Sequence, residues 1–385
     1  MQGVNPTILT WARKQSGFSL NDIATHFKKE PQFIQDWENG ISSPSFPQLE
    51  KLANKYKRPT ALFFFPKPPE EMPISQSFRT LPEQEASYIQ PSLRHIIRKA
   101  KVMQMNLFEL NNGVNPAENL LLQLIDVSNK SIDDVANELR LLIEINLKKQ
   151  MTYKKPEVAF KAWRNALEKY GIFVFKDAFK DEGFSGFCLY DEIFPVIYIN
   201  NSLPHSRQVF TLFHELAHLL FGIDGIEVLS NNQGYLNKLS ETNKRIEVFC
   251  NAFSGKFLVP DAAFDKYLDS EVNNVVLESI SKKFAVSREV ILRKFLDNQK
   301  ITANFYAQKV KEWKNSSKEQ KNNKKLGGNS DYTKRVYLGE TYMETAFSQY
   351  YNNNISTQQL ADYLDVKPWR IPAMESLIFE NGSHL

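Results

Sequence analysis

The fold is organised around one stretch of sequence, Thr211-Leu212-Phe213-His214-Glu215-Leu216-Ala217-His218-Leu219-Leu220-Phe221. At about 100° per residue its apolar side chains predict a helix with one buried face. That face is formed by Val209, Phe213, Leu216 and Leu220. His214 and His218 are one helical turn apart on the other side, so their imidazoles can hold one Zn²⁺ at ~2.0–2.1 Å. Glu215, on an adjacent face, can act as a base on a water molecule at the metal.

Length and composition indicate a globular chain of several domains. The 385 residues suggest two to three domains, and 42% apolar with 12% aromatic content is typical of folded proteins. No apolar run reaches membrane-spanning length, and residues 1–20 lack the pattern of a signal peptide. Only Cys188 and Cys250 are present, so we expect a reducing cytoplasm. The net charge of +4 is mild, and any nucleic-acid surface must therefore be local.

Residues 1–66 show the spacing of short helices joined by tight turns. A helix is predicted from about Pro31 to Glu38, with proline at its first turn. The motif around it reads Trp37-Glu38-Asn39-Gly40, then Ser43-Pro44-Ser45, then Leu49-Glu50-Lys51-Leu52-Ala53. This segment resembles the Xre/Cro-like helix-turn-helix family. The resemblance implies an all-α bundle whose third helix enters the DNA major groove.

The same resemblance indicates which residues would contact DNA. The base-reading candidates are Gln32, Phe33 and Gln35, and the phosphate-contacting candidates are Lys28 and Lys29. The sequence departs from the family pattern at Leu20, where a polar phosphate contact is usual. Glu30 and Asp36 would also repel phosphate. The alternative is a bundle that binds a protein or dimerises.

Residues 67–200 connect this bundle to the central helix. Up to about residue 92 the chain is too rich in proline for regular structure, and from there to residue 150 apolar spacing predicts helices. After a further helix that ends at Gly171, three strands are predicted at residues 172–175, 186–190 and 196–199. A small sheet is a suitable scaffold beside the central helix, because an edge strand can hold an extended peptide by main-chain pairing.

Two histidines do not complete a catalytic zinc site, which needs a third protein ligand and an open position. No histidine follows until His384, so a carboxylate must serve. The candidates are Asp224, Glu227, Glu241, Glu247 and Asp261. We favour Glu247, at the margin of the apolar stripe of a helix predicted over residues 245–260, with Asn251 one turn on to orient its carboxylate. Asp224 and Glu227 follow the motif in an apparent loop, from which reaching back is harder. If Glu247 is not a metal ligand, the alternative is a carboxylate that faces solvent on this helix.

Together these motifs resemble the ImmA/IrrE family of zinc peptidases. The similar segments are Ile199-Asn200-Asn201, Arg207 to His218, Glu247, Asn251-Ala252-Phe253 and Leu258-Val259-Pro260. The N-terminal bundle and the linker with Phe63-Phe64-Phe65-Pro66 and Phe78-Arg79 are similar to members that carry an Xre-type domain. The resemblance implies a gluzincin-like site with His214, His218 and Glu247 as ligands and Glu215 as catalytic base. It also implies relatives that cleave Xre-type repressors under DNA damage or stress, and fused members that act in toxin–antitoxin-like pairs.

The C-terminal part is expected to be helical and small. Residues 301–332 read as a helix end followed by a flexible polar linker, and residues 333–385 as a helical module. Residues 355–364 are similar to residues 18–24, the entry of the helix-turn-helix, but Pro368 and Pro372 predict that no reading helix follows. A small docking module is therefore favoured.

The sequence thus predicts a multidomain, mainly α protein. The expected parts are an Xre-type bundle (1–66), a proline-rich linker with a helical connector (67–150), an α+β zincin-like, gluzincin peptidase domain with a small sheet (151–300), a polar linker (301–332) and a helical module (333–385). We expect a cytoplasmic zinc endopeptidase and regulator, with Mn²⁺ as the other candidate metal. Its partner would be a protein, such as an Xre-type repressor, and double-stranded DNA and a homodimer are both compatible with the sequence. The alternative is a non-proteolytic transcriptional regulator or antitoxin. Tyr235 and His205 are candidates to stabilise an oxyanion.

Overall fold

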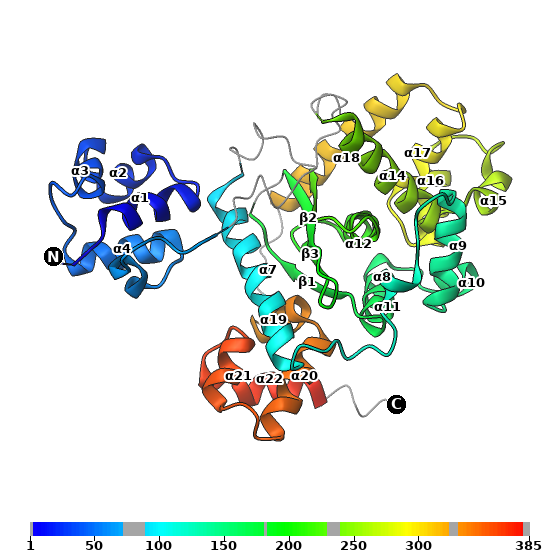
Figure 1. Ribbon diagram of the computed structural model, residues 1–385. Coiled ribbons are helices and arrows are strands. Elements are labelled where there is room, and N and C mark those ends of the chain that lie inside the picture. The colour runs from blue at the N-terminus through cyan, green and yellow to red at the C-terminus, as the bar shows by residue number, and fades with distance from the viewer. Residues whose placement is uncertain (1–2, 72–88, 181–182, 229–238, 323–329, 380–385) are drawn as a thin grey trace. The chain divides into compact units, whose positions relative to one another are not determined.

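The computed structural model describes residues 3–71, 89–180, 183–228, 239–322 and 330–379 (Figure 1). Its contacts divide the chain into one unit of residues 1–99 with 179–181 and a second unit of residues 100–178 with 182–385. The division falls within helix α7 (Pro91–Leu110). The described chain is mainly α with one four-stranded sheet, which confirms the predicted fold class. Among the described helices, none combines the length and apolar composition needed to cross a bilayer.

The first unit contains a small all-α bundle. Its elements are α1 (Pro6–Gln15), α2 (Leu20–Phe27), α3 (Pro31–Glu38), α4 (Phe46–Tyr56) and the 3₁₀ helix η1 (Thr60–Phe64). Ser19 begins α2 with a capping box, in which its hydroxyl accepts from the Asp22 N–H while the Asp22 carboxylate accepts from the Ser19 N–H. Arg13 donates two hydrogen bonds, of 2.7 and 2.8 Å, to the Glu38 carboxylate and so ties α1 to α3. The bounds of α3 are those predicted from its proline and its apolar spacing.

The second unit is built on a mixed sheet with the strand order β1-β3-β2-β4. Its strands are β1 (Phe173–Asp177), β2 (Phe184–Leu189), β3 (Val196–Asn200) and β4 (Gly225–Val228). Strand β3 pairs parallel to β1 and antiparallel to β2, and β4 pairs antiparallel to β2 at the edge of the sheet. The first three strands confirm the sequence prediction, whereas β4 was expected to be a loop.

Helix α12 (His205–Leu220) carries the His-Glu-x-x-His motif and packs on this sheet and on α14 (Glu241–Leu258) (Figure 1). Val209, Phe213 and Leu216 are buried in the core, as the apolar spacing predicted. The other helices of this core are α8 (Leu121–Leu124), α9 (Ile132–Leu142), α10 (Leu147–Gln150), α11 (Pro156–Lys169), α15 (Asp261–Phe264), η2 (Asp265–Tyr267), α16 (Asn274–Phe284) and α17 (Arg288–Asp297). Because Leu121, Val135 and Leu139 share one core with Trp163 and Phe213, the boundary predicted at residue 150 does not separate two cores.

The polar segment after this core differs from the prediction. Helix α18 (Ala303–Asn322) covers most of the stretch expected to be a flexible linker. Residues 323–329, which include its two glycines, lie outside the described residues. Charged and amide side chains are good helix formers, so a polar composition did not exclude a helix here.

The C-terminal module contains a second pair of helices with the capping and turn pattern of α2 and α3. Its elements are α19 (Ser330–Leu338), α20 (Glu340–Tyr351), α21 (Thr357–Tyr363), η3 (Pro368–Arg370) and α22 (Ile371–Phe379). Four features of the first bundle recur in this module, each the same number of residues further along the chain. The paired residues are the N-caps Ser19 and Ser356, the left-handed Lys28 and Asp365, the helix-starting Pro31 and Pro368, and the buried Ile34 and Ile371. The expectation that prolines exclude this second helix is therefore wrong, because both lie in first turns, where proline is tolerated.

Buried polar contacts attach this module to the core of the second unit. Arg164 on α11 donates hydrogen bonds of 2.9 Å to the carbonyls of Val336 and Leu338, and its Nε donates to Glu168, also at 2.9 Å. Glu168 in turn accepts a 2.7 Å hydrogen bond from the Thr341 hydroxyl. The module is thus part of the second unit and is held by satisfied, buried groups.

Lys176 on β1 is an unusual buried cation in this core. Its side chain is only 5% exposed, and its Nζ lies 3.6 Å from the centre of the Phe160 ring. Burial lowers the pKa of Lys176 to about 7, with Arg164 acting in the same direction and Glu157 against it. In the unfolded chain a lysine keeps its proton up to about pH 10. Between these values the unfolded state binds more protons, so this group makes the fold more stable as pH rises.

Replacing Lys176 tests directly whether its low pKa makes the stability of the fold depend on pH. Lys176→Met should raise the free energy of unfolding at pH 6 by roughly 1–3 kcal/mol, because a buried charge is removed. The gain should shrink as pH rises from about 7 towards 10, where the wild-type lysine becomes neutral in the fold. Urea unfolding at pH 6 and pH 9 measures both values. A gain that is the same at both pH values would contradict the assigned pKa.

Candidate metal centre

Two glycines bring the sheet into direct contact with α12. A Cβ atom at Gly225 on β4 would lie 2.4 Å from ring carbons of His218, and one at Gly186 on β2 would lie 2.5 Å from Cγ2 of Thr211. Real Cβ atoms do not approach other atoms so closely, so only glycine allows this packing. As a result the polar face of α12 is covered by the sheet, and His214, Glu215 and His218 are each at most 1% exposed.

The two motif histidines and Glu247 converge on one point. The Nε2 atoms of His214 and His218 are 3.2 Å apart, and each lies 3.3–3.4 Å from one carboxylate oxygen of Glu247 on α14. These three residues form a buried group that could hold a metal ion, with ligand atoms within 4.8 Å of one another. Two imidazoles and one carboxylate are the ligand set of catalytic zinc sites that keep a fourth position open.

The surrounding groups fit a bound cation. Both oxygens of Glu215 and Oε1 of Glu247 are buried without a hydrogen-bond partner among the described residues. Three carboxylates, those of Glu215, Glu227 and Glu247, are packed around two histidines. Buried polar groups normally have partners, and buried anions normally have cations. A divalent cation would satisfy the Glu247 oxygen.

Burial and the neighbouring charges set the pKa values of this cluster. Burial raises the pKa of Glu215 to about 8, with Glu227 and Glu247 acting in the same direction and His214 against it. Burial alone would lower the pKa of His214, but Glu227, Glu247 and Glu215 outweigh it and raise the pKa to about 9. For Glu247, burial acts to raise the pKa, but His218 and His214 hold it well below its usual range. At neutral pH a metal must therefore displace a proton from His214, whereas Glu247 is already ionised.

Of three supporting residues named from the sequence, the structure describes Asn251 and His205. The side-chain amide of Asn251 donates a 2.9 Å hydrogen bond to the backbone carbonyl of Glu247, and no hydrogen bond to the Glu247 carboxylate is seen, so the orienting role stays a prediction that this geometry does not support. His205 is the first residue of α12, about 13 Å along the helix axis from His214, which is too far to stabilise an oxyanion there. Tyr235 lies outside the described residues.

The sequence analysis named Glu227 only as a less favoured candidate ligand and did not predict its place beside the motif helix. It was placed in a loop, but it lies on β4, is 4% exposed and forms an ion pair with Arg207 on α12. Burial acts to raise the pKa of Glu227, and Arg207, His214 and the hydroxyls of Thr211 and Ser185 together lower it. Cys188 on β2 also reaches this region, since its sulfur accepts a 3.2 Å hydrogen bond from the Gly225 N–H. The signal in the sequence was the short alternation Gly225-Ile226-Glu227-Val228.

The predicted DNA contacts on α2 and α3 fall into two groups. Lys28 and Lys29, in the turn before α3, and Gln35 are exposed, as a contact surface requires. Gln32 is also exposed, but its amide donates a 2.8 Å hydrogen bond to Asp36. Phe33 is only half-exposed and packs on Trp37 with ring centres 4.7 Å apart, which makes it a structural residue more than a base reader.

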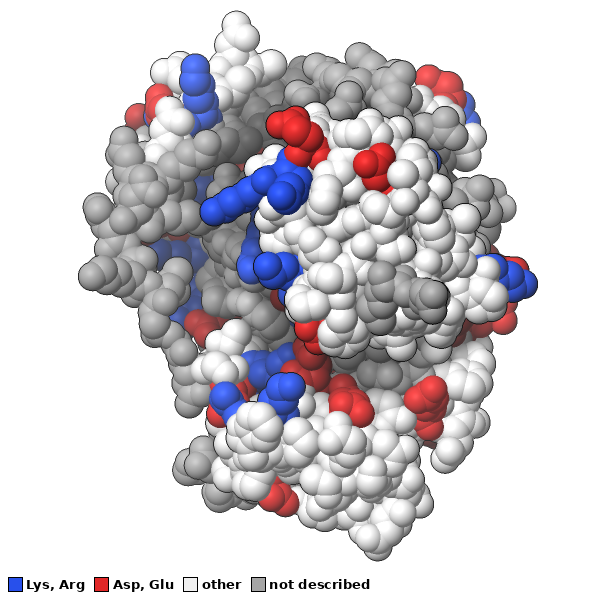
Figure 2. Space-filling view, turned by 90° about the vertical axis from the view of Figure 1, so that its left-hand side faces the viewer, with Lys and Arg blue, Asp and Glu red and all other residues white. Residues whose placement is uncertain are grey.

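Charge on the bundle is weakly basic and dispersed. Residues 1–66 contain eight lysines and arginines against five acidic residues. On the face shown in Figure 2, basic side chains lie in small groups with acidic ones among them, and much of the described surface carries neither. Such a surface supplies a modest electrostatic contribution to nucleic-acid binding.

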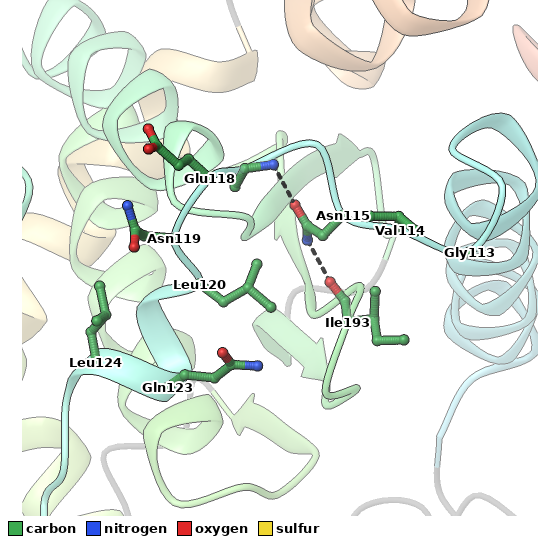
Figure 3. Close-up of a pocket in the computed structure, with 10 residues that line it drawn as sticks. Gly113, Val114, Asn115, Glu118, Asn119, Leu120, Gln123, Leu124 and Ile193 are labelled. Atoms are coloured by element: carbon green, nitrogen blue, oxygen red, sulfur yellow. Dashed lines mark hydrogen bonds between the residues drawn. The ribbon is translucent and has the colours of Figure 1, made fainter.

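A separate hollow of about 390 Å³ lies beside the loop that follows α7 (Figure 3). Its most buried polar side chain, Asn115, donates hydrogen bonds to the carbonyls of Gly171 and Ile193 and accepts one from the Ala117 N–H. Figure 3 shows the hydrogen bond of this amide to Ile193. Every hydrogen bond of the Asn115 side chain is made to the backbone and holds the loop in place. Asn115 therefore gives no indication of a ligand in the hollow.

Comparison with known families agrees with this geometry. Residues 167–296 match the family model described as the IrrE N-terminal-like domain, which is a peptidase family, and residues 9–63 match a helix-turn-helix model. The first match spans β1 to α17 and includes His214, Glu215, His218 and Glu247. The two matches and their order confirm the predicted resemblance to a peptidase with a fused Xre-like domain. Searches of curated proteins and of solved structures found no match.

Competition between protons and zinc for His214 gives a test of the metal centre. Because the raised pKa of His214 is about 9, the apparent zinc affinity of the full chain should rise by up to about tenfold per pH unit between pH 7 and 9 and then level off. Competition with a chromophoric chelator, corrected for the chelator's own protonation, measures this dependence. His205→Gln, at the far end of α12, serves as the matched control and should show the same profile. A profile that is flat from pH 7 to 9 would show that no ligand with a raised pKa is displaced.

Proposed function

We propose that this protein is a zinc-dependent endopeptidase that acts on a protein partner and serves as a regulator. The observation that carries the proposal is the convergence of His214, His218 and Glu247 in one buried group that could hold a metal ion. Glu215 follows the first histidine on the same helix, and a purely structural metal site has no use for such a carboxylate. The match of residues 167–296 to a peptidase family supports the same reaction class.

Each side chain has a definite task in this reaction. His214, His218 and Glu247 would hold the metal and leave one position open towards substrate. Zinc, when bound, supplies Lewis acidity that makes water more acidic and the scissile carbonyl more electrophilic. The positive charge of a bound metal would favour the ionised form of Glu215, which would then take a proton from the attacking water and deliver it to the leaving amine, so that protons balance over the reaction. The apolar core around α12 excludes other water and strengthens these electrostatic interactions.

The substrate is proposed to be an extended segment of a protein. Strand β4 is at an edge of the sheet and lies against α12, so an extended peptide that paired with it would run past the metal centre. The resemblance to ImmA/IrrE peptidases points to an Xre-type repressor as this protein and to a stress or mobile-element response as the setting. Mn²⁺ could replace Zn²⁺ where its availability in the cell favours it.

The helix-turn-helix would bind DNA and so bring the enzyme to the place where it acts. Its match to a helix-turn-helix family supports double-stranded DNA as a partner. The exposed Lys28, Lys29 and Gln35 are the residues proposed to contact it. With Gln32 bonded to Asp36 and Phe33 packed on Trp37, contacts to phosphate would outweigh contacts to bases.

Removing two exposed lysines tests DNA binding by the bundle. The double variant Lys28→Ala, Lys29→Ala should bind duplex DNA of any sequence more weakly, and the slope of log K against log salt should fall by about 0.9 for each phosphate that is no longer neutralised. Fluorescence anisotropy at several salt concentrations measures both quantities. The adjacent exposed pair Lys148 and Lys149 on α10, changed in the same way, is the control. An equal weakening in the two double variants would contradict a DNA interface specific to the helix-turn-helix.

One observation favours a rival function. All four residues of the centre are at most 4% exposed, so the described structure gives little access to a substrate. A non-proteolytic regulator or antitoxin with a structural or sensory metal would need no such access. It would bind DNA through the helix-turn-helix and a toxin through the peptidase-like domain.

Glu215→Gln separates the two functions. It keeps the size of the side chain and the three metal ligands but removes the base, so zinc should still bind at one equivalent while the cleavage rate falls about 10²–10⁴-fold. The measurement incubates wild type and variant, both of known metal content, with the proteins that co-purify from the native host. Glu168→Gln, which removes a buried carboxylate elsewhere, should cleave like wild type. If wild type and Glu215→Gln bind the same partner equally and neither cuts it with zinc present, the rival function replaces the peptidase.

A further inference from the structure

The two histidines present one ring nitrogen to the metal position and leave the other behind. Their Nε2 atoms face each other and Glu247, while both Nδ1 atoms are buried without a hydrogen-bond partner among the described residues. A histidine that binds metal through Nε2 carries a proton on Nδ1, and that N–H needs an acceptor to fix the ring. Each Nδ1–H therefore requires an acceptor on the side of its ring that faces away from the metal position.

Strand β4 places a carboxylate behind His214. Gly225 lies directly against the His218 ring, and Glu227, two residues further, is on the same face of the strand. Two strand residues advance about 6.8 Å, and the four helix residues from His218 back to His214 cover about 6 Å. Because Glu227 also forms an ion pair with Arg207, which is nearly two turns N-terminal to His214, the strand runs back along α12 past His214. Glu227 and His214 are thus neighbours across the contact between strand and helix.

The two carboxylate oxygens of Glu227 have different surroundings. Oε1 accepts a hydrogen bond from Arg207, whereas Oε2 is buried without a partner among the described residues. The Nδ1 of His214 is likewise without a partner there. Glu227 and His214 each change the pKa of the other, which agrees with their being close together. Oε2 of Glu227 and Nδ1 of His214 are thus buried polar atoms of neighbouring residues, and no hydrogen bond joins them in the structure. The hydroxyls of Thr211 and Ser185 also act on this carboxylate.

We infer that Glu227 is the positioning residue of His214. Its Oε2 accepts a hydrogen bond from the Nδ1–H of His214 when metal is bound, which selects the tautomer with the Nε2 lone pair free for the metal. Arg207 holds the other oxygen and keeps the carboxylate ionised. The inference rests on the proposed function only in assuming that a metal binds at the Nε2 atoms. It does not make Glu227 a metal ligand, because the convergent group consists of His214, His218 and Glu247.

A structural role for Glu227 is the competing explanation. The Arg207–Glu227 ion pair could serve only to attach β4 to α12. Glu168 offers a matched comparison, since it is a buried carboxylate paired with an arginine, Arg164, in the same unit and is not part of the metal centre. Loss of charge at either position removes a buried ion pair, but only loss at Glu227 should change the metal ligand.

The first measurement is zinc affinity of the full chain by chelator competition. Glu227→Gln should bind zinc about 10–100-fold more weakly, the range found when a carboxylate behind a metal-bound histidine is removed. Glu168→Gln should bind zinc with wild-type affinity. Wild-type affinity in Glu227→Gln, or an equal loss in both variants, would overturn the inference. Because affinity does not depend on catalysis, a protein that cuts no substrate could still pass this test, and failure here would leave the peptidase proposal standing.

The second measurement reads the hydrogen bond itself. The chain contains only 6 histidines, so ¹⁵N-labelled histidine gives a simple spectrum in the zinc-loaded protein. Wild type should show a protected Nδ1–H resonance for a histidine bound through Nε2, shifted downfield by a carboxylate acceptor. That resonance should move upfield in Glu227→Gln and stay in place in Glu168→Gln. A wild-type spectrum in which both ligands bind through Nδ1, or lack this downfield proton, would overturn the inference even if Glu227→Gln failed to fold.

Discussion

The structure of the second unit depends on how closely α12 lies against the sheet. Gly186 and Gly225 allow the approach, and any side chain at Gly225 would occupy the space of the His218 ring. The contact removes water from the polar side of α12, where a helix of a globular protein would normally face solvent. It also sets the position of β4 relative to His214. Histidines that would otherwise be exposed thus become buried ligands, and every charged group nearby must find its partner inside the protein.

The charged groups of the centre are balanced by different means. Glu227 is neutralised by Arg207, and Glu247 by the two histidines, which hold its pKa low. Glu215 forms no ion pair of its own with the described residues, and burial raises its pKa to about 8. Removing one partner of a buried ion pair strongly destabilises the fold, so few of these residues can be replaced singly. The physical argument for a cation is that both Nε2 atoms and the Glu247 carboxylate converge on one point, where a metal could take the place of the proton that His214 otherwise holds.

Local patterns predicted the elements well and the contacts between them less well. Helical periodicity located α12 and α14, and the scarcity of histidine left a carboxylate as third ligand, which the structure brings to the motif as Glu247. Strand β4 was missed because its four residues are too few for a clear alternation, and its pairing with β2 bridges almost forty residues. Asn251 has the right helical spacing, but an asparagine amide can also bond to its own helix carbonyl four residues back, and here it does.

The two helix pairs, α2 with α3 and α21 with η3 and α22, share a local backbone pattern but expose different side chains. Both begin with a serine capping box, turn at a left-handed residue and start the next helix with proline. Helix α3 then exposes the amides of Gln32 and Gln35, whereas the corresponding positions of η3 and α22 expose Trp369 and Pro372. Paired amide groups can read base edges, and an indole beside a proline cannot do so in the same way. The C-terminal pair therefore shares the capping and turn pattern of α2 and α3 without their exposed amides, and its role must be argued from its surface instead of from this pattern.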